Sequence, residues 1–427
     1  MAMFSDEPKA ESGYWTNMGG GGNSTSTLSG VKVNEDRVNG LSAYYACLRV
    51  VSEDVGKLPL NVYRKTKGGG KEIDTDNPIQ WLLHSEPNNF MTSMIWRASV
   101  TANALGHGMG YSHIQRNALK EPIGFFPIES QRVEVEVVGK GSMQELIYKV
   151  SKGTGKPDVI KAKDMLVIPN LGSNGLVGWS VLKIAAQSLG LTIAAQDFGA
   201  SFFGNGAALK GVLTVNGKLK DDGRKRLRNG WNDLYSGVNN SCKTAILEDG
   251  ATYSALTIPP NDAQFLETRN FQVEEIARWF RVPPNKIQHL LHATFSNVEQ
   301  ENLSYTNDTL KSWLIKWEQE INRKLFAESK GEVFAEHNMN ALLRGDQAAR
   351  SAFYTSLFNL GSLSPNEIRG FENQNPIPDG DNYFVQMNMT TLDRAVAGEV
   401  AGETEEDTVN TDVIPNDNTE PEEEMTE

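Results

Sequence analysis

Cysteine is scarce in this sequence. Cys47 and Cys242 are the two cysteines among 427 residues, and they lie far apart in the chain. Small extracellular domains held together by disulfides use many more cysteines, and a structural zinc site needs four ligands at short, characteristic spacings. The sequence therefore offers neither a disulfide framework nor a zinc cluster, and it is typical of a protein that folds in a reducing compartment.

Long hydrophobic runs are also missing. The opening residues, MAMFSDEPKAESGYW, contain no apolar stretch of the kind that a secretory signal needs. The most apolar segment, residues 177–203, is interrupted by Lys183, Gln187, Gln196 and Asp197. Each of these residues is costly at the centre of a bilayer. We therefore expect no membrane partner and interpret this segment as a buried or interface helix.

Positive charge is not in excess. The formal net charge is -13 at pH 7, and residues 398–427 carry twelve acidic residues and no Lys or Arg, so the rest of the chain is close to neutral. A protein that grips duplex DNA neutralises phosphates with clustered Lys and Arg. The composition thus argues against tight DNA binding, and it predicts a solvated, disordered acidic tail.

Familiar catalytic motifs are missing too. The chain has no G-x-S-x-G, H-E-x-x-H or C-x-x-C pattern. Its nearest approach to a phosphate-binding loop, Gly211–Lys218, has its glycines one residue too far apart, and Leu219 stands where a magnesium-binding Ser or Thr belongs. His289 and His292 have no third metal ligand nearby, so histidines that are satisfied or that face solvent explain them better. We predict no catalytic residue, no cofactor and no metal site.

What the sequence does contain is a long helix–loop–helix pattern at residues 261–326. Asn261 and Asp262 are good N-cap residues for the first helix, and Pro283-Pro284 should stop it. Ser296 and Glu299 fit a capping box that starts the second helix. The second helix is predicted to carry one apolar seam, made of Leu303, Leu310, Trp313, Leu314, Trp317, Ile321 and Leu325.

The loop between these helices is unusual. Connections between bundle helices usually have about 2 to 8 residues, and this one is longer and consists of small, polar and aromatic residues with little charge. One interpretation is a helical hairpin with a poorly packed loop. The other is a loop that projects into a shared space and contacts something that moves.

The remaining chain has three parts. Residues 31–171 read as one α+β domain in which helices precede short alternating strands. Residues 174–206 predict one helix crowded with Ala and Gly, and either close helix–helix approach or ordinary burial would compensate the low helix propensity of its glycines. Residues 210–260 predict a small inserted module with a strand, a charged helix and a hairpin that turns at Asp249-Gly250.

Several motifs follow one another in a set order. They are the helix ending FFGNGA, the strand GVLTV, the hairpin AILEDGATYSALTI, then DAQFLETRNFQVEEIARWFRVPPNKI, TFSNVEQEN and LLRGDQAARSAFYTSLFNLGSLSPNEIR. As a set, they closely resemble the portal, or head–tail connector, proteins of long-tailed (siphovirus-type) double-stranded DNA bacteriophages. The resemblance covers about residues 31–384 and is densest between Gln264 and Asn302.

The resemblance implies an α+β fold, as an elongated portal-type subunit with a wing, a helical stem, an inserted α/β clip, a tunnel loop and a helical crown. The implied segments are a flexible lead 1–30, the wing 31–173, a stem helix 174–206, the clip 207–260, a second stem helix 261–282, the tunnel loop 283–297, a long wing helix 298–327, the crown 328–397 and a disordered acidic tail 398–427.

The resemblance also implies which residues act. The tunnel loop facing the DNA channel would use Gln288, His289, His292, Thr294, Phe295, Ser296 and Asn297. The clip would dock the packaging terminase and later the neck through Arg224, Arg226, Arg228, Trp231, Glu248 and Asp249. No catalysis is expected, because in this family the ATPase is the terminase.

The implied function is a homo-oligomeric ring, typically a dodecamer, at one capsid vertex, through which the genome is packaged and ejected. The implied partners are the large terminase subunit, the major capsid and scaffolding proteins, a neck or head-completion adaptor and double-stranded DNA that passes non-specifically. The protein would belong to the virion and assemble in the host cytoplasm.

Two other functions stay open at this stage. A metal-dependent nuclease or hydrolase would need a carboxylate cluster, and the missing ligand spacing argues against it. A minor capsid protein or head adaptor would bind the capsid without forming a channel, and the long helix–loop–helix argues against that.

Overall fold

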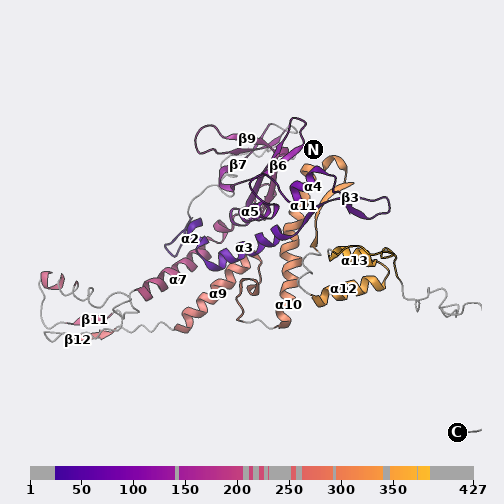
Figure 1. The fold of residues 1–427 in the computed structure, drawn as a ribbon. Helices are drawn as coiled ribbons and strands as arrows, with labels where there is room; N and C mark the ends of the chain where they lie inside the picture. The colour runs from indigo at the N-terminus through magenta and orange to yellow at the C-terminus, as the bar shows by residue number, and fades with distance from the viewer. Residues whose placement is uncertain are drawn as a thin grey trace, which may run out of the picture. The chain divides into compact units, whose positions relative to one another are not determined.

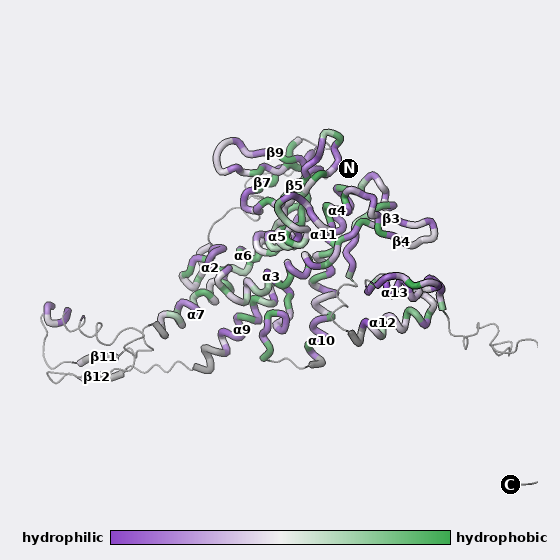
Figure 2. Tube along the Cα trace, viewed as in Figure 1, coloured by the Kyte–Doolittle hydropathy of each residue, from purple (hydrophilic) through white to green (hydrophobic). Residues whose placement is uncertain are grey.

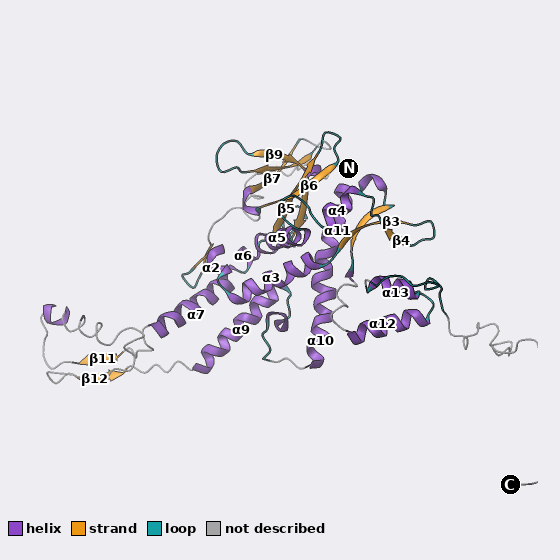
Figure 3. Ribbon diagram, in the orientation of Figure 1, coloured by secondary structure: helices purple, strands orange, loops and turns teal. Residues whose placement is uncertain are grey.

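The computed structural model describes residues 25–139, 144–204, 211–214, 221–225, 229, 252–255, 262–291, 295–339, 347–372 and 374–384. These residues fall into two compact units, unit 1 up to Ala341 and unit 2 from Leu342 onward. Figure 1 shows the elements of both units, and Figure 3 distinguishes helices from strands. Among the described residues, no helix has both the length and the apolar character that a membrane span requires.

The strands of unit 1 form small antiparallel sheets. Three sheets have three strands each, in the orders β10-β5-β6, β13-β3-β4 and β7-β8-β9, and the hairpins β1-β2 and β11-β12 complete the set. The strands are β1 Thr25–Ser26, β2 Lys32–Val33, β3 Leu60–Lys65, β4 Lys71–Ile73, β5 Met109–Arg116, β6 Pro122–Ile128, β7 Val133–Val138, β8 Glu145–Val150, β9 Asp158–Lys161, β10 Met165–Pro169, β11 Gly211–Thr214, β12 Thr252–Ala255 and β13 Val333–His337.

Unit 1 also contains several long helices. Along most of them hydrophobic and hydrophilic stretches alternate (Figure 2), as expected for helices with one buried face, whereas α7 is apolar on more than one face. They are α2 Glu35–Asn39, α3 Ser42–Lys57, α4 Pro78–His84, α5 Ser93–His107, α6 Val181–Ile184, α7 Ala186–Gly204, α9 Asp262–Phe280, α10 Phe295–Ser304, the π-helical segment η6 Tyr305–Leu310 and α11 Lys311–Leu325, with the short 3₁₀ turns η1 Ser130–Arg132, η3 Ala162–Asp164, η5 Pro284–Ile287 and η7 Ala327–Ser329.

Helix α3 lies at the centre of unit 1, in contact with α2, α5, α9, η5 and η6. It approaches α5 closely at Gly56, where an added Cβ would lie 2.7 Å from the carbonyl oxygen of Met94. The buried Arg97 of α5 donates to the carbonyls of Gly56 at 2.9 Å and Leu58 at 2.7 Å. Burial lowers the pKa of Arg97 to about 10, so it stays charged at neutral pH and complements the negative end of the α3 dipole.

A tryptophan pair joins α11 to α5 and, through a hydrogen bond, to β5. Trp96 of α5 and Trp317 of α11 are fully buried, and their ring centroids lie 5.1 Å apart at an interplanar angle of 77°. Each indole has a polar partner, because Trp96 Nε1 donates to Ser112 Oγ at 2.9 Å and Trp317 Nε1 donates to Thr101 Oγ1 at 3.0 Å. The C-terminal half of the predicted seam, Leu310 to Ile321, is therefore confirmed as core.

The boundary expected at residue 328 is wrong. β13 pairs with β3 in an antiparallel register that joins Ala335 to Val62, so residues 333–337 belong to a sheet of unit 1 and not to a helical crown. On the other side of β3, β4 completes this sheet as its third strand. The pairing of β13 was not predicted because a short strand is specified by its partner more than by its own pattern.

The helix expected over residues 174–206 starts later and is interrupted. Residues 171–180 are irregular, because Asn174 Oδ1 accepts from the backbone N–H groups of Leu176 and Val177, and Gly175 has φ +72°. α6 then ends at Ala185, and α7 continues from Ala186 to Gly204.

Residues 25–30 belong to the lead that was expected to be flexible, but in the structure β1 of this segment pairs with β2. This hairpin rests on α7. An added Cβ at Gly190 would lie 2.6 Å from Thr27 Cγ2, and the N–H of Leu28 donates to Gln187 Oε1 at 3.0 Å. Small residues in α7 thus do permit a close approach, and at Gly190 the approaching element is a hairpin and not a helix.

Unit 2 contains α12 Gln347–Asn359 and α13 Pro365–Phe371. Ser364 and Glu367 form the capping box that starts α13. Glu372 connects the two helices, because its Oε1 accepts from Tyr354 at 2.7 Å and lies 3.4 Å from Arg350 Nε. Both helices lie within residues 328–397, and the assignment of this segment as a crown stays a prediction.

Replacing Gly190 by Ala tests the docking of the N-terminal hairpin. Alanine favours the helix by about 1 kcal/mol, but the clash with Thr27 should outweigh this and destabilise the protein by about 1–3 kcal/mol. Adding Thr27→Gly should restore stability, since it removes the clashing atoms. Gly370→Ala in α13, with nothing within 4 Å of the added Cβ, is the matched control and should raise the unfolding midpoint. A Gly190→Ala protein as stable as this control would show that the hairpin does not pack there.

Candidate functional site

The candidate site is the junction between α9 and α10, where the sequence predicts a projecting loop. Helix α9 ends as predicted, just before the two prolines. Arg281 takes a left-handed conformation with φ +53°, and the N–H of Val282 reaches back to the carbonyl of Ala277 at 3.0 Å. This is the geometry of a helix C-terminus closed by a residue in the left-handed region.

A short 3₁₀ turn, η5, follows from Pro284 to Ile287 and closes at Gln288, which also lies in the left-handed region with φ 61°. The N–H of His289 donates to the carbonyl of Pro284 at 3.0 Å. Leu290 and Leu291 come next and are 60% and 57% exposed. The base of the loop is therefore fixed at both ends of η5, and two leucines project from it that were not among the predicted site residues.

Several polar side-chain atoms of α9 and of residues 285–289 are buried without a hydrogen-bond partner. Among the described residues, His289 Nε2, Gln272 Nε2 and both side-chain amide atoms of Asn285 have no hydrogen bond. The nearest carboxylate to His289 is Glu274, whose Oε1 lies 4.0 Å from Nε2. The His289 side chain is thus partly buried beside a carboxylate, and its predicted role in a loop that faces the channel stays a prediction.

The structure shortens the predicted loop. Phe295, Ser296 and Asn297 form the first turn of α10, so they belong to the helix and not to the loop. His292 and Thr294 lie outside the described residues. Five of the six predicted clip residues also lie outside them, namely Arg226, Arg228, Trp231, Glu248 and Asp249. Arg224 is helical and exposed, 3.9 Å from Asp221.

Helix α10 does not continue directly into α11. Residues 305–310 form a π-helical segment, in which the N–H of Lys311 donates to the carbonyl of Thr306, five residues back. Such segments are rare, and they occur frequently at functional sites. The sequence signal for it was overlooked: Ser304-Tyr-Thr-Asn-Asp-Thr309 is a run of poor helix formers in an otherwise apolar pattern.

The π-helical segment holds the junction together through two side chains. Tyr305 is 2% exposed and its hydroxyl donates to Asp54 Oδ2 of α3 at 2.8 Å. Burial, reinforced by the Asp54 carboxylate, raises the pKa of Tyr305 above its ordinary value, so the phenol stays protonated and donates. Thr309 Oγ1 donates to the carbonyl of Arg281 at 2.7 Å, at the left-handed end of α9. The ring of Tyr305 also lies under Lys286 of η5, 5.2 Å from its Nζ.

The π-helical segment also moves the buried stripe of the helix. Leu303, a predicted seam residue, is 54% exposed, whereas Tyr305 is buried. The seam prediction is wrong at Leu303, because an inserted residue rotates everything before it by about 100° relative to α11.

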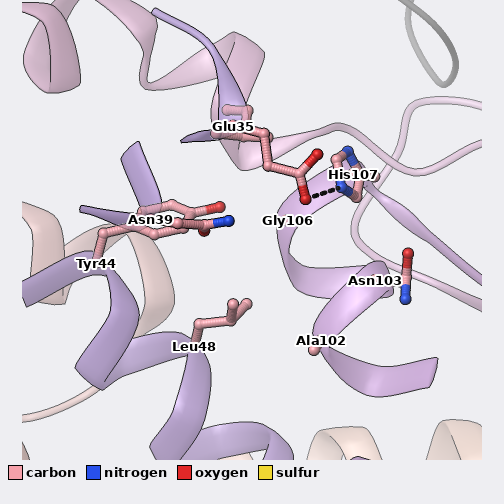
Figure 4. Close-up of a pocket in the computed structure, with 9 residues that line it drawn as sticks. Glu35, Asn39, Tyr44, Leu48, Ala102, Asn103, Gly106 and His107 are labelled. Carbon is pink, nitrogen blue, oxygen red and sulfur yellow. Dashed lines mark hydrogen bonds and ion pairs between the residues drawn. The ribbon is translucent and has the colours of Figure 1, made fainter. Parts of the chain in front are cut away.

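A pocket lies between α2, α3 and the end of α5, and Figure 4 shows its lining. Glu35 Oε1 lies 3.3 Å from His107 Nε2, and Glu35 Oε2 accepts from Gln131 Nε2 at 2.6 Å. These contacts join α2 to α5 and η1, so the pocket is best explained as a polar tie within unit 1. Among the described residues, no group of three or more His, Cys, Asp or Glu side chains could hold a metal ion.

Comparison with known proteins gives consistent matches. The family model described as "Phage portal protein" matches residues 42–373. The chain is 32% identical over 359 residues to the portal protein of Enterobacteria phage HK97, covering 83% of each chain. It is also 32% identical over 362 residues to the probable portal protein of Streptomyces phage phiC31, covering 82% of this chain and 78% of that one.

Solved structures share the fold. A phage portal protein of the HK97 family from Corynebacterium diphtheriae superposes with a TM-score of 0.54 at 15% identity, covering 75% of this chain and 98% of that chain. A chain from the neck of a native GTA particle, computed with C12 symmetry, superposes with a TM-score of 0.53 at 19% identity, covering 84% and 97%. At these identities the likeness concerns the fold alone.

Thr309→Val tests the tie between the π-helical segment and α9. The substitution keeps the size of the side chain and leaves the carbonyl of Arg281 without its donor, so it should destabilise the protein by about 1–2 kcal/mol. It should also speed amide hydrogen exchange at residues 282–289. Thr309→Ser retains the hydroxyl and should leave exchange in this segment close to wild type. Equal exchange in the two variants would show that the hydroxyl does not hold the loop base.

Proposed function

Because this chain belongs to the phage portal protein family, we propose that it assembles into a closed ring at one vertex of a phage capsid and forms the channel through which the genome enters and leaves. The observation that supports this most is the similarity to the HK97 portal protein, at 32% identity over 83% of both chains. A dodecamer is the subunit number that this proposal takes from the resemblance.

The loop after η5 is proposed to face the channel. The described part of this loop differs from a DNA-binding surface, because it ends in the exposed, uncharged Leu290 and Leu291. Contacts with phosphates add salt-dependent affinity, and affinity would slow a DNA that must slide. The two exposed leucines, on a base fixed by η5, instead present shape to a moving polyanion without binding it.

Ring closure needs two different surfaces on each subunit, because a cyclic head-to-tail contact is heterologous. Helices α7 and α9 pack against each other and keep large apolar side chains on their outside. Leu191 of α7 is 51% exposed, and Phe271 and Trp279 of α9 are 54% and 39% exposed. Neighbouring copies are proposed to cover these side chains, since a ring contact would remove their apolar surface from water.

The partners follow from this role. The inserted module around Arg224 is proposed to dock the large terminase subunit during packaging and the neck adaptor afterwards, with the major capsid and scaffolding proteins around the ring. Assembly is proposed to take place in the host cytoplasm, and the ring then remains in the virion. Double-stranded DNA is a non-specific partner, and the terminase supplies the ATPase.

Replacing His292 and Phe295 by Ala tests the role of the loop. The variant should form rings as the wild type does, because the ring is proposed to close through α7 and α9, and it should package or retain markedly less DNA because the channel has lost its contact. Packaged DNA per particle, measured by nuclease protection in a complementation assay, gives the readout. The same substitutions at the exposed His84 and Phe90 are the matched control. Normal packaging by the loop variant would show that this loop does not serve the channel.

A further inference from the structure

The polar tie around Glu35 occupies the rim of the pocket in Figure 4 and leaves the rest of the cavity open. The tie uses His107 and Gln131, which contact the two carboxylate oxygens of Glu35. The remaining volume is about 100 Å³. The side chains of Tyr44 from α3 and Asn39 from α2 both point into it, toward Glu35 and His107. The cavity therefore still has polar groups available after the helices are joined.

The hydroxyl of Tyr44 is the unusual group in this cavity. Tyr44 is 1% exposed, and no other described residue forms a hydrogen bond with its hydroxyl. An added Cβ at Gly106 would lie 3.3 Å from the hydroxyl oxygen, which places this oxygen against the last turn of α5. Buried hydroxyl groups normally have a hydrogen-bond partner. The Tyr44 hydroxyl thus indicates a partner that binds in the cavity.

The electrostatic environment of the cavity favours a cation. Glu35 supplies a carboxylate, and residues 103–107 of α5 carry the negative end of a fifteen-residue helix. Burial, followed by the charge of Glu35, raises the pKa of Tyr44 above its ordinary value, so the hydroxyl keeps its proton. Among the described residues, no Lys or Arg lines the pocket. Arg37 of α2 is engaged elsewhere, since its guanidinium lies 2.5 Å from Asp197 of α7.

The rest of the lining indicates what kind of cation fits. Leu48, Ala102 and Leu182 form an apolar wall, against which an alkyl chain can lie while its charged end reaches the polar groups. A carboxylate accepts about four hydrogen bonds, an amide oxygen and a phenol oxygen also accept, and an ammonium group has three donors and no acceptor. The three kinds of acceptor in the cavity therefore match one ammonium group.

A metal ion matches the cavity less well. Magnesium and calcium take six or more oxygen ligands, with carboxylates prominent among them, and this cavity offers the single carboxylate of Glu35. In the part of the chain that the structure describes, no three His, Cys, Asp or Glu side chains are grouped to hold a metal. The apolar wall would also have no role with a bare ion.

We propose that this cavity binds a primary ammonium group on a short alkyl chain, with Glu35, Asn39 and the hydroxyl of Tyr44 as its acceptors. Two sources carry this group, namely a free alkylamine and a lysine side chain of another polypeptide. Either one joins α2 to α3 and α5, beside the ion pair of Arg37 and Asp197 that joins α2 to α7. All three acceptors belong to one subunit, so the site does not rest on the proposed portal function.

Saturation-transfer NMR of the full-length protein with n-butylamine tests the site at neutral pH. Butyltrimethylammonium has the charge and the chain but no N–H donor, and 1-butanol has the chain but no charge. We expect n-butylamine to bind about tenfold more tightly than either, because hydrogen bonds to charged groups are stronger than neutral ones. Equal binding of the three probes would overturn the ammonium assignment.

Two substitutions test the acceptors. Tyr44→Phe removes one hydroxyl and Glu35→Gln removes the charge, and each should weaken n-butylamine binding about tenfold or more. Tyr45→Phe and Asp36→Asn, at exposed positions next in the chain, are the controls and should bind as the wild type does. Unchanged binding by Tyr44→Phe and Glu35→Gln would show that n-butylamine binds elsewhere.

The stability of the Tyr44→Phe protein without amine gives a second readout. Since the hydroxyl has no partner in the described part of the chain, its removal should leave the unfolding midpoint unchanged or raise it. A lower midpoint would assign the hydroxyl a structural role and contradict the proposal.

Cryo-EM of the assembled protein, with and without n-butylamine, distinguishes the two sources. Density that continues into a lysine of a neighbouring chain identifies that lysine as the ligand. A cavity that n-butylamine fills, with no lysine in the untreated map, identifies a free amine. Water alone in both maps overturns the proposal. The same maps show whether the protein forms a ring, so failure of this site and failure of the portal function are seen separately.

Discussion

The guanidinium of Arg97 is buried against the last carbonyls of α3, and the rest of unit 1 depends on this fixed helix. Without a carboxylate partner, the charge is stabilised by backbone oxygens at the negative end of a helix dipole. Removing it would leave those carbonyls unsatisfied in the core. With its end held, α3 presents Tyr44 to Phe280 of α9, ring centroids 5.1 Å apart, and Asp54 to the π-helical segment.

This arrangement fixes the base from which two leucines project. α3 contacts α9, η5 and η6 together, so these three elements share one support. After Gln288, the described part of the loop exposes the uncharged side chains of Leu290 and Leu291. For a channel whose cargo must move in both directions, a firmly placed surface of low affinity is the useful property.

Features that depend on local sequence could be predicted, and features that depend on distant partners could not. Pro283-Pro284 marked the end of α9, and the spacing from Leu310 to Ile321 marked the core face of α11. The strand pairing of β13 with β3 and the docking of Thr27 on Gly190 join segments far apart in the chain, and no local pattern specifies them. At the site, the double proline predicted the loop. The π-helical insertion shifted the apolar seam by one residue. Separately, α10 begins at Phe295, which was predicted to belong to the loop.

End-on cryo-EM of the purified, assembled protein tests the central claim most directly, that this chain encircles DNA and presents the segment after η5 to it. The account predicts a closed ring with a central channel, in which residues 288–294 are those nearest the axis. Isolated subunits under all conditions, or a ring with these residues on its outer rim, would contradict it.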